Sequence, residues 1–191
     1  MITERTAFRA GQAGLTVKNL VWIDEAGMNL SMTTMYARAR RGQRAVEHRP
    51  STRTAKTSLV GAITSEGMVS LGTVQGSYNT ARFLAWLATD LLPKLGPGRV
   101  LVWDNIRFHF NVAVVAAVKA AGCTLLKMPP YSPDLNPIEE CWSKLKQSVR
   151  RLKARTQAAL DSAIEAARAQ LQPADFTGWI RHAGYPTPGS T

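Results

Sequence analysis

Apolar and polar positions follow two different periods along the chain, and the change between them divides it into two halves. In the first half, short apolar runs bounded by turn residues have strand character, at residues 18–24, 43–48, 56–64 and 68–75. The second half alternates helical and strand patterns, with helix 80–92, strand 99–103, helix 108–121, strand 124–127 and helix 137–152. An antiparallel meander followed by β/α units predicts an α/β fold in which a mixed sheet has helices on both faces.

The two ends of the chain have weaker patterns. The N-terminal residues are polar and are expected to be loosely ordered, whereas residues 157–171 have an amphipathic helical pattern that Pro173 should end. The tail from Ala183 is rich in glycine and proline and is expected to be mobile. The length favours a single domain with three parts, which are an extension at 1–17, the domain proper at 18–155 and a C-terminal helix and tail at 156–191.

The segment Pro129–Lys146, with the sequence PPYSPDLNPIEECWSKLK, is the most informative part of the chain. Its prolines and the Ser132-Pro133-Asp134 turn predict an extended entry into a helix. Asn136 can cap that helix, and Pro137 suits its first position. One stripe of the helix is apolar and should face inward, through Ile138, Trp142, Leu145 and Val149. Glu139 lies beside this stripe, where it can face a cleft.

Both glutamates of this helix also have purely structural interpretations. Glu139 is the third residue after Asn136, where a glutamate completes a capping box. Glu140 is spaced for an i,i+4 ion pair with Lys144. On this segment alone, the structural interpretation is favoured for both residues.

Two aspartates upstream change that balance. Asp24 follows the apolar run at 20–23, and Asp104 follows the run at 100–103, so each is expected at the carboxyl end of a buried strand. Glu139 follows Asp104 after 34 intervening residues. Carboxylate oxygens suit hard divalent cations such as Mg²⁺ and Mn²⁺, and Mg²⁺ usually binds through one or two carboxylates per ion. The three residues together therefore indicate a metal site.

The ordered segments VWIDEAGMN, LVWDNIRFH and PPYSPDLNPIEECW resemble the catalytic domain of DDE superfamily transposases. The resemblance is to bacterial insertion sequences of the insertion sequence 630 type, related to Tc/mariner elements, and covers roughly residues 19–155. It implies an RNase H-like fold with a mixed five-stranded sheet flanked by helices. It also implies that Asp24, Asp104 and Glu139 bind two Mg²⁺ ions, which Mn²⁺ could replace. The choice of Glu139 over Glu140 rests on this resemblance.

Two further residues match the family pattern near the second aspartate. Asn105 and His109 could support the site, although an asparagine before a helix is commonly a cap, and an isolated histidine commonly has a structural role.

The resemblance also implies a reaction and partners. Such enzymes cleave DNA phosphodiesters at transposon ends and join the freed 3′-hydroxyl to target DNA, here at a TA-containing target. We expect double-stranded DNA as the substrate, a homodimer in the active complex, and a separate N-terminal helix-turn-helix module that reads the transposon ends. Two alternatives stay open: another RNase H-like nuclease, such as a resolvase or an RNA–DNA hybrid nuclease, and a decayed or domesticated DNA-binding module without catalysis.

The composition agrees with a DNA partner. Lys and Arg number 24 against 13 Asp and Glu, which gives a formal net charge of +11. One expected DNA-binding cluster contains Arg38, Arg40, Arg41 and Arg44, and the other contains Lys144, Lys146, Arg150, Arg151, Lys153 and Arg155. No apolar stretch approaches the length of a membrane span and no signal peptide is evident, so we expect a bacterial cytoplasmic, nucleoid-associated protein. The two cysteines, Cys123 and Cys141, are expected to be free buried thiols.

Overall fold

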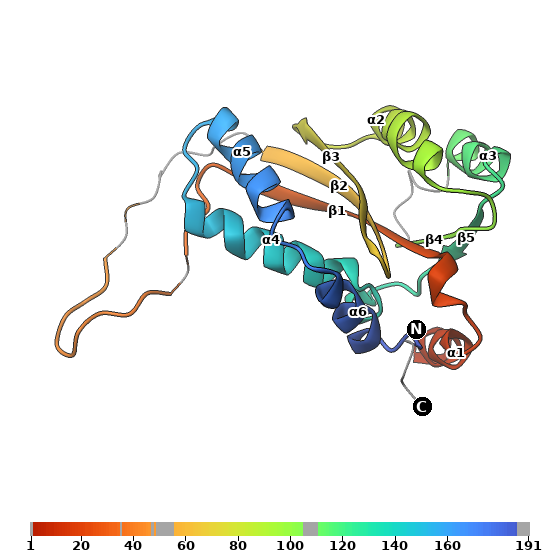
Figure 1. The fold of residues 1–191 in the computed structure, drawn as a ribbon, viewed down its shortest axis with the longest axis horizontal. Helices are drawn as coiled ribbons and strands as arrows, with labels where there is room; N and C mark the ends of the chain where they lie inside the picture. Colours follow the sequence, from red (N-terminus) through yellow and green to blue (C-terminus); the bar gives the residue numbers. More distant parts are fainter. Residues whose placement is uncertain (1, 35, 47, 49–55, 105–110, 187–191) are drawn as a thin grey trace.

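The computed structural model describes residues 2–34, 36–46, 48, 56–104 and 111–186 of the chain. Five strands form one sheet in the order β3-β2-β1-β4-β5 (Figure 1). Their bounds are β1 Leu20–Asn29, β2 Lys56–Thr64, β3 Gly67–Gln75, β4 Val100–Trp103 and β5 Thr124–Lys127. β1, β2 and β3 pair antiparallel, whereas β4 and β5 run parallel to β1. The predicted mixed sheet is confirmed.

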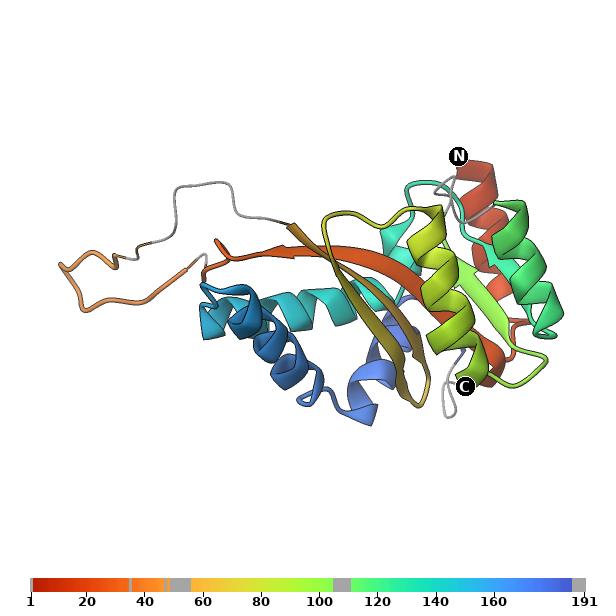
Figure 2. The same cartoon turned by 90° about the horizontal axis from the view of Figure 1, so that it is seen from above.

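The described residues form six α-helices around the sheet, and two of these helices cover one of its faces. The helices are α1 Ile2–Gln12, α2 Thr80–Trp86, α3 Val112–Ala120, α4 Ile138–Leu152, α5 Gln157–Arg168 and α6 Pro173–His182. α2 continues through a π-helical turn at Leu87–Leu91 into a 3-10 turn at Leu92–Lys94. α2 and α3 pack on one face, and α4, α5 and α6 on the other (Figure 2). No helix among the described residues is both long and apolar enough to cross a membrane.

Alternation along the strands divides the buried side chains between two cores. Trp22 of β1 points to the α4 face, whereas its neighbours Val21 and Ile23 point to the α2 face. Because both faces of β1 are buried, its start is a continuous apolar run rather than an alternating one. This central strand therefore fixes the positions of groups on both sides of the sheet.

Helix α1 corrects the prediction that residues 1–17 are loosely ordered. Its Phe8 packs against the core on the α4 face, and Gln12 is 2% exposed. The Gln12 side chain donates a hydrogen bond to the carbonyl of Ala183, 3.1 Å away. Tertiary contacts of this kind stabilise a helix whose own sequence pattern is weak.

One further prediction is wrong at the level of a single element, and one element was not predicted. The strand expected at 43–48 is not formed by the residues of this range that the structure describes, which are exposed; the partner of β1 is β2 instead. Pro173 begins α6 rather than only ending the previous helix, since proline suits the first turn, where its missing N–H is not needed. The Gln172 and Asp175 pair completes the capping box of α6.

The segment after α6 is also more ordered than expected. Ala183 and Tyr185 are 4% and 2% exposed, and the Tyr185 ring packs edge-on against Trp22 with a centroid distance of 5.0 Å. The predicted mobile tail is therefore wrong for residues 183–186, and residues 187–191 lie outside the described part of the chain.

Candidate active site

Asp24 lies in the middle of β1, which corrects the prediction that the strand ends there. The strand continues to Asn29 because residues 22–29 pair with β2, and Asp24 lies opposite Gly61. The Asp24 side chain is 8% exposed and accepts a hydrogen bond from Trp142 Nε1 at 3.2 Å. A Cβ on Gly61 would come within 2.6 Å of the Trp142 ring, so the glycine leaves the space that the indole needs.

Asp104 directly follows β4, as predicted. The parallel register pairs Trp22 with Val102, so the residues two positions further along, Asp24 and Asp104, are neighbours across the same pair of strands. Trp22 and Val102 both face α4, and the two-residue period directs the two aspartates toward the same face. Strand register thus brings together two carboxylates that are 80 positions apart.

Glu139 is in the first turn of α4. The helix begins at Ile138 after Pro137, and the Glu139 backbone N–H donates to the Asn136 carbonyl at 3.1 Å. The N-terminus of α4 has no side-chain capping bond, so the expected capping role of Asn136 is not seen. The inward stripe is confirmed, and its buried members are Ile138, Trp142, Leu145 and Val149.

The predicted i,i+4 ion pair between Glu140 and Lys144 is also wrong. Lys144 forms an ion pair with Asp175 of α6, and Glu140 lies instead 4.0 Å from His182 on the outer side of the helix. Glu140 therefore faces solvent and α6, not the sheet. Of the two neighbouring glutamates, only Glu139 lines the cavity described next.

Asp24, Asp104 and Glu139 line one cavity of about 400 Å³. Burial, together with the nearby charges of Glu139, Glu25 and Asp104, raises the pKa of Asp24 to about 8. Burial likewise raises the pKa of Glu139, with Lys146 opposing this effect and Asp104 adding to it. These mutual effects show that the three carboxylates are close enough to repel one another, and a bound cation would offset this repulsion.

The donor set of this cavity fits a hard divalent cation. Besides the three carboxylates, Asn136 lines the cavity; it is 4% exposed, and its Oδ1 has no hydrogen-bond partner among the described residues. All of these donors are oxygens, which suit Mg²⁺ and Mn²⁺. No three His, Cys, Asp or Glu side chains of the described residues are arranged to hold one ion by themselves. Mg²⁺ does not require such a group, because it keeps waters and uses substrate phosphates as ligands.

A family model for the DDE superfamily endonucleases matches residues 19–161. The chain belongs to this family. No curated protein sequence matches it. Membership in the DDE superfamily agrees with the resemblance carried by the three sequence segments; the match does not distinguish the insertion sequence 630 type.

Solved structures of Mos1 transposase have the same fold as this DDE endonuclease. A Mos1 paired-end complex with the left transposon end superposes with a TM-score of 0.80 at 16% identity, covering 95% of this chain and 57% of that chain. A Mos1 paired-end complex with Mg has a TM-score of 0.77 at 17% identity and the same coverages. The isolated Mos1 catalytic domain has a TM-score of 0.64 at 13% identity, covering 97% of this chain and 92% of that chain. The predicted RNase H-like fold is confirmed, and the chain spans 57% of the length of the longer Mos1 chains.

The remaining predicted site residues do not all reach the cavity of the DDE endonuclease. Asn105 and His109 lie outside the described residues. Arg38, Arg40, Arg41 and Arg44 are exposed and belong to the excursion between β1 and β2, whose residues 36–46 project from the sheet (Figure 1).

The second basic cluster contains two cations with a structural role and one cation near the cavity. Lys144 is paired with Asp175, and Arg155 donates to the carbonyls of Leu30 and Met32, so these two cations support the fold. Lys146 acts on the Glu139 pKa and is therefore the basic side chain of α4 near the cavity. Arg150 and Arg151 are in the last turn of α4, where positive charges interact favourably with the helix dipole and stabilise the helix.

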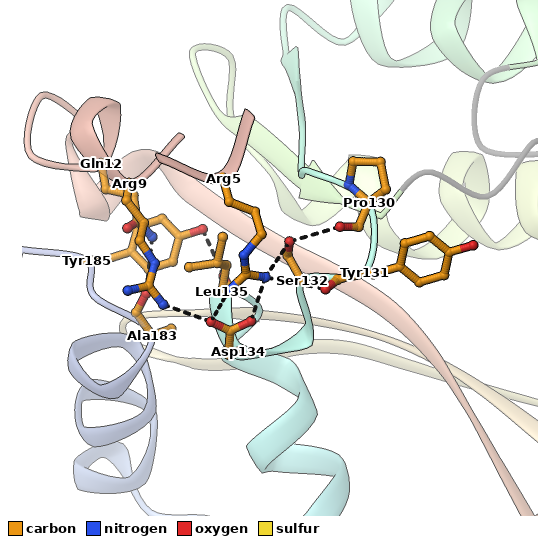
Figure 3. Close-up of polar contacts among 10 residues, drawn as sticks. All are labelled: Arg5, Arg9, Gln12, Pro130, Tyr131, Ser132, Asp134, Leu135, Ala183 and Tyr185. Carbon is orange, nitrogen blue, oxygen red and sulfur yellow. Dashed lines mark hydrogen bonds and ion pairs between the residues drawn. The ribbon is translucent and has the colours of Figure 1, made fainter. Parts of the chain in front are cut away.

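Sequence reasoning missed the arginines that contact the loop between β5 and α4. Residues 128–133 of this loop line the cavity, and Arg5 and Arg9 of α1 bind its Asp134 (Figure 3). The i,i+4 spacing of the two arginines was a signal for a shared helical face. Because residues 1–17 were not expected to be helical, the spacing of the two arginines was not interpreted as a shared helical face.

Proposed function

We propose that this chain is the catalytic domain of a transposase that cleaves DNA at transposon ends and transfers the 3′-hydroxyl to target DNA, using divalent metal ions. The observation that carries the proposal is the convergence of Asp24, Asp104 and Glu139 on one cavity from β1, β4 and α4. Family membership supports it, as do the Mos1 structures, which include paired-end, strand-transfer, Mg and Mn complexes. Nothing in the fold favours a resolvase, a hybrid nuclease or a non-catalytic module.

In this proposal Asp24, Asp104 and Glu139 hold two Mg²⁺ ions, and Mn²⁺ can replace them. Bound ions of this kind would act as Lewis acids toward the phosphoryl oxygens and toward the attacking and leaving oxygens. The Asp24 carboxylate is held in one orientation by Trp142, whose indole N–H occupies one of its oxygens. Asn136 offers an amide to a phosphate oxygen or an ordered water in the cavity. The other residues that line the cavity are mostly apolar, with Met128 and three prolines among them.

The decisive experiment compares the two neighbouring glutamates. Glu139→Gln should reduce Mg²⁺-dependent nicking of supercoiled plasmid DNA by more than about 100-fold, because it removes a charge at the metal. Glu140→Gln should change the rate by less than about threefold, since its side chain faces outward. Thermal melting of both variants checks that the fold is intact. The reverse ranking would show that the glutamate is misassigned, and unaffected nicking in both would refute the proposed site.

We also propose that the DNA path includes exposed members of the two basic clusters. Replacing Arg38, Arg40, Arg41 and Arg44 by glutamine should flatten the log–log salt dependence of DNA affinity by roughly 0.9 for each phosphate that the variant no longer neutralises. The matched variant replaces Lys146, Arg150 and Arg151. Fluorescence anisotropy titrations with one duplex at several salt concentrations compare both with the unaltered chain. An unchanged slope in either variant removes that cluster from the path.

The wider assembly belongs to the same proposal. We place the catalytic domain at residues 18–155, with 156–191 packed on it, and expect it to act as a homodimer with a helix-turn-helix module that reads the transposon ends. A TA target and a place at the bacterial nucleoid in the cytoplasm follow from the same family resemblance. The chain spans 57% of the length of the Mos1 chain in the paired-end complex.

A further inference from the structure

The loop between β5 and α4, residues 128–135, forms a wall of the cavity in an unfavourable backbone conformation. Tyr131 has a φ of 52°, in the left-handed region that non-glycine residues seldom occupy, and its side chain is 88% exposed. The Tyr131 ring points away from α1, so the ring itself does not tie the loop to that helix (Figure 3). Such a conformation persists only when surrounding contacts determine it.

Those contacts come from α1, at the other end of the chain. Arg5 Nη1 donates to Ser132 Oγ at 2.7 Å, to Asp134 Oδ1 at 3.0 Å and to the Tyr131 carbonyl at 3.3 Å. Arg5 Nη2 donates to Asp134 Oδ2 at 2.8 Å, and Arg9 Nη2 reaches the same oxygen at 2.8 Å (Figure 3). One guanidinium thus binds three parts of the loop in a fork that lysine cannot reproduce.

A second set of contacts keeps α1 in place. Gln12 donates to the Ala183 carbonyl at 3.1 Å, and Tyr185 Oη donates to the Leu135 carbonyl at 3.1 Å. Tyr185 is 2% exposed and lies against Trp22, so this anchor is rigid. The loop is therefore held from α1 and from the segment after α6, and it leads directly into the first turn of α4, which carries Glu139.

We infer that Arg5 and Arg9 are positioning residues, through which α1 holds the 128–135 loop in the conformation that shapes the cavity and sets Glu139. The inference rests on the proposed function for its catalytic consequence, but the loop contacts themselves do not depend on it. Surface ion pairs of this exposure contribute little to global stability. Their effect is on the ratio of molecules with an open loop to molecules with an ordered loop, which changes tenfold for each 1.4 kcal/mol.

The test combines proteolysis with nicking in the full chain. Chymotrypsin cleaves after tyrosine when the local backbone opens, so its rate at Tyr131 reports the order of the loop without DNA or metal. Tyr36, which is 92% exposed in the excursion between β1 and β2, is an internal control in the same digest. Mass spectrometry separates the two cuts. The variants are Arg5→Ala, Arg5→Lys and Arg9→Ala, with Arg168→Ala as a matched loss of an exposed arginine ion pair.

In Arg5→Ala, cleavage at Tyr131 should be about tenfold faster, with cleavage at Tyr36 unchanged. The kcat for Mg²⁺-dependent nicking of supercoiled plasmid should fall about tenfold, with KM within about twofold. Arg9→Ala and Arg5→Lys should give smaller changes of both kinds, and Arg168→Ala neither. Adding Asp134→Ala to Arg5→Ala should add no more than the effect of Arg9→Ala, because the Arg9 ion pair is the remaining contact of Asp134 with α1 that it removes.

Several outcomes overturn the inference. Cleavage at Tyr131 that matches Arg168→Ala would show that α1 does not order the loop, and faster cleavage at both tyrosines would indicate general unfolding. Faster cleavage at Tyr131 with normal nicking would deny the loop a catalytic role. A raised KM with normal kcat would make Arg5 a DNA contact rather than a positioning residue. If the unaltered chain fails to nick DNA, the proposed function fails, while the cleavage rates still decide whether α1 orders the loop.

Discussion

On the face of the sheet covered by α2 and α3, buried polar groups form a connected chain, whereas on the face covered by α4 they crowd around a cavity. Trp86 Nε1 donates to Ser70 Oγ at 2.9 Å, Ser70 donates to Asp90, and Asp90 pairs with Lys94 at 2.6 Å. This chain ends in a surface ion pair, so both oxygens of the Asp90 carboxylate have a partner. It fastens the π-helical turn of α2 to β3 without creating a site.

On the α4 face, some buried polar groups lack such partners. Asp24 is buried beside other carboxylates, and the buried Oδ1 of Asn136 has no partner among the described residues. Both features cost stability in the absence of a ligand. The difference indicates that the α2 face contributes mainly to folding stability. The α4 face is less stable than it could be because it carries the candidate active site, as expected where a site is built into a core.

The largest expected effect is on the α2 face. Phe83 is fully buried and packs against Trp86 and Trp103 with ring centroids 5.6 and 5.8 Å away. Phe83→Ala should lower the free energy of unfolding by about 3–5 kcal/mol, measured by urea denaturation. A loss below about 1 kcal/mol would show that this face does not carry the stability assigned to it.

A smaller loss of folding stability is expected at Gly61, which packs against the Trp142 ring that orients Asp24. Gly61→Ala places a Cβ against the Trp142 ring and should cost about 1–3 kcal/mol. It should also impair nicking, because the displaced indole no longer orients Asp24. Gly96→Ala is the control, since nothing lies within 4 Å of a Cβ there. Equal effects of the two alanines on melting and nicking would contradict the role given to Gly61.

The comparison predicts a gain of stability at Asp24. At pH 9, above its pKa of about 8, this buried carboxylate is charged, so Asp24→Asn should raise the unfolding free energy of the chelator-treated protein by about 1–2 kcal/mol. The asparagine Oδ1 can still accept from Trp142. Thermal melting in EDTA and in Mn²⁺ measures the effect. Mn²⁺ should stabilise the unaltered chain and not the variant, and a destabilised variant in EDTA would refute the burial cost.

The smallest expected effect on stability concerns Asp175, a charged residue on the α4 side whose carboxylate is bound by other groups. The pKa of Asp175 is lowered, because the bonds from Lys144 and the Gln172 backbone N–H outweigh the opposing effect of burial. A lowered folded-state pKa means stability that is present above the unfolded pKa and lost as the pH falls through the folded value. Asp175→Asn should therefore cost about 1 kcal/mol at about pH 7 and nothing near pH 2.

Urea midpoints at the two pH values check this prediction, with exposed Asp161→Asn as the control. A loss that stays constant with pH would show that the capping geometry, rather than the charge, stabilises α6.

The sequence predicted those site elements that local chemistry determines. The prolines and the apolar stripe between Pro129 and Val149 located α4 and Glu139 within a residue, and the run before Asp104 located the end of β4. Asp24 was misplaced within its strand, because the length of β1 depends on pairing with β2, which local patterns do not contain. The contacts of Arg5 and Arg9 were missed for the same reason, since their partners are more than 120 positions away.

The register between β1 and β2 has a consequence for how this protein can vary. Asn29 and Lys56 are directly paired, so the chain leaves the sheet and returns to it at adjacent points, and the described residues between them lie outside the ladder. The cost of closing such a loop changes only slowly with its length. The paired residues are therefore a natural insertion point, at which relatives can exchange, lengthen or shorten a whole segment. Grafting a short hairpin turn between them would leave the strand that carries Asp24 with its partner.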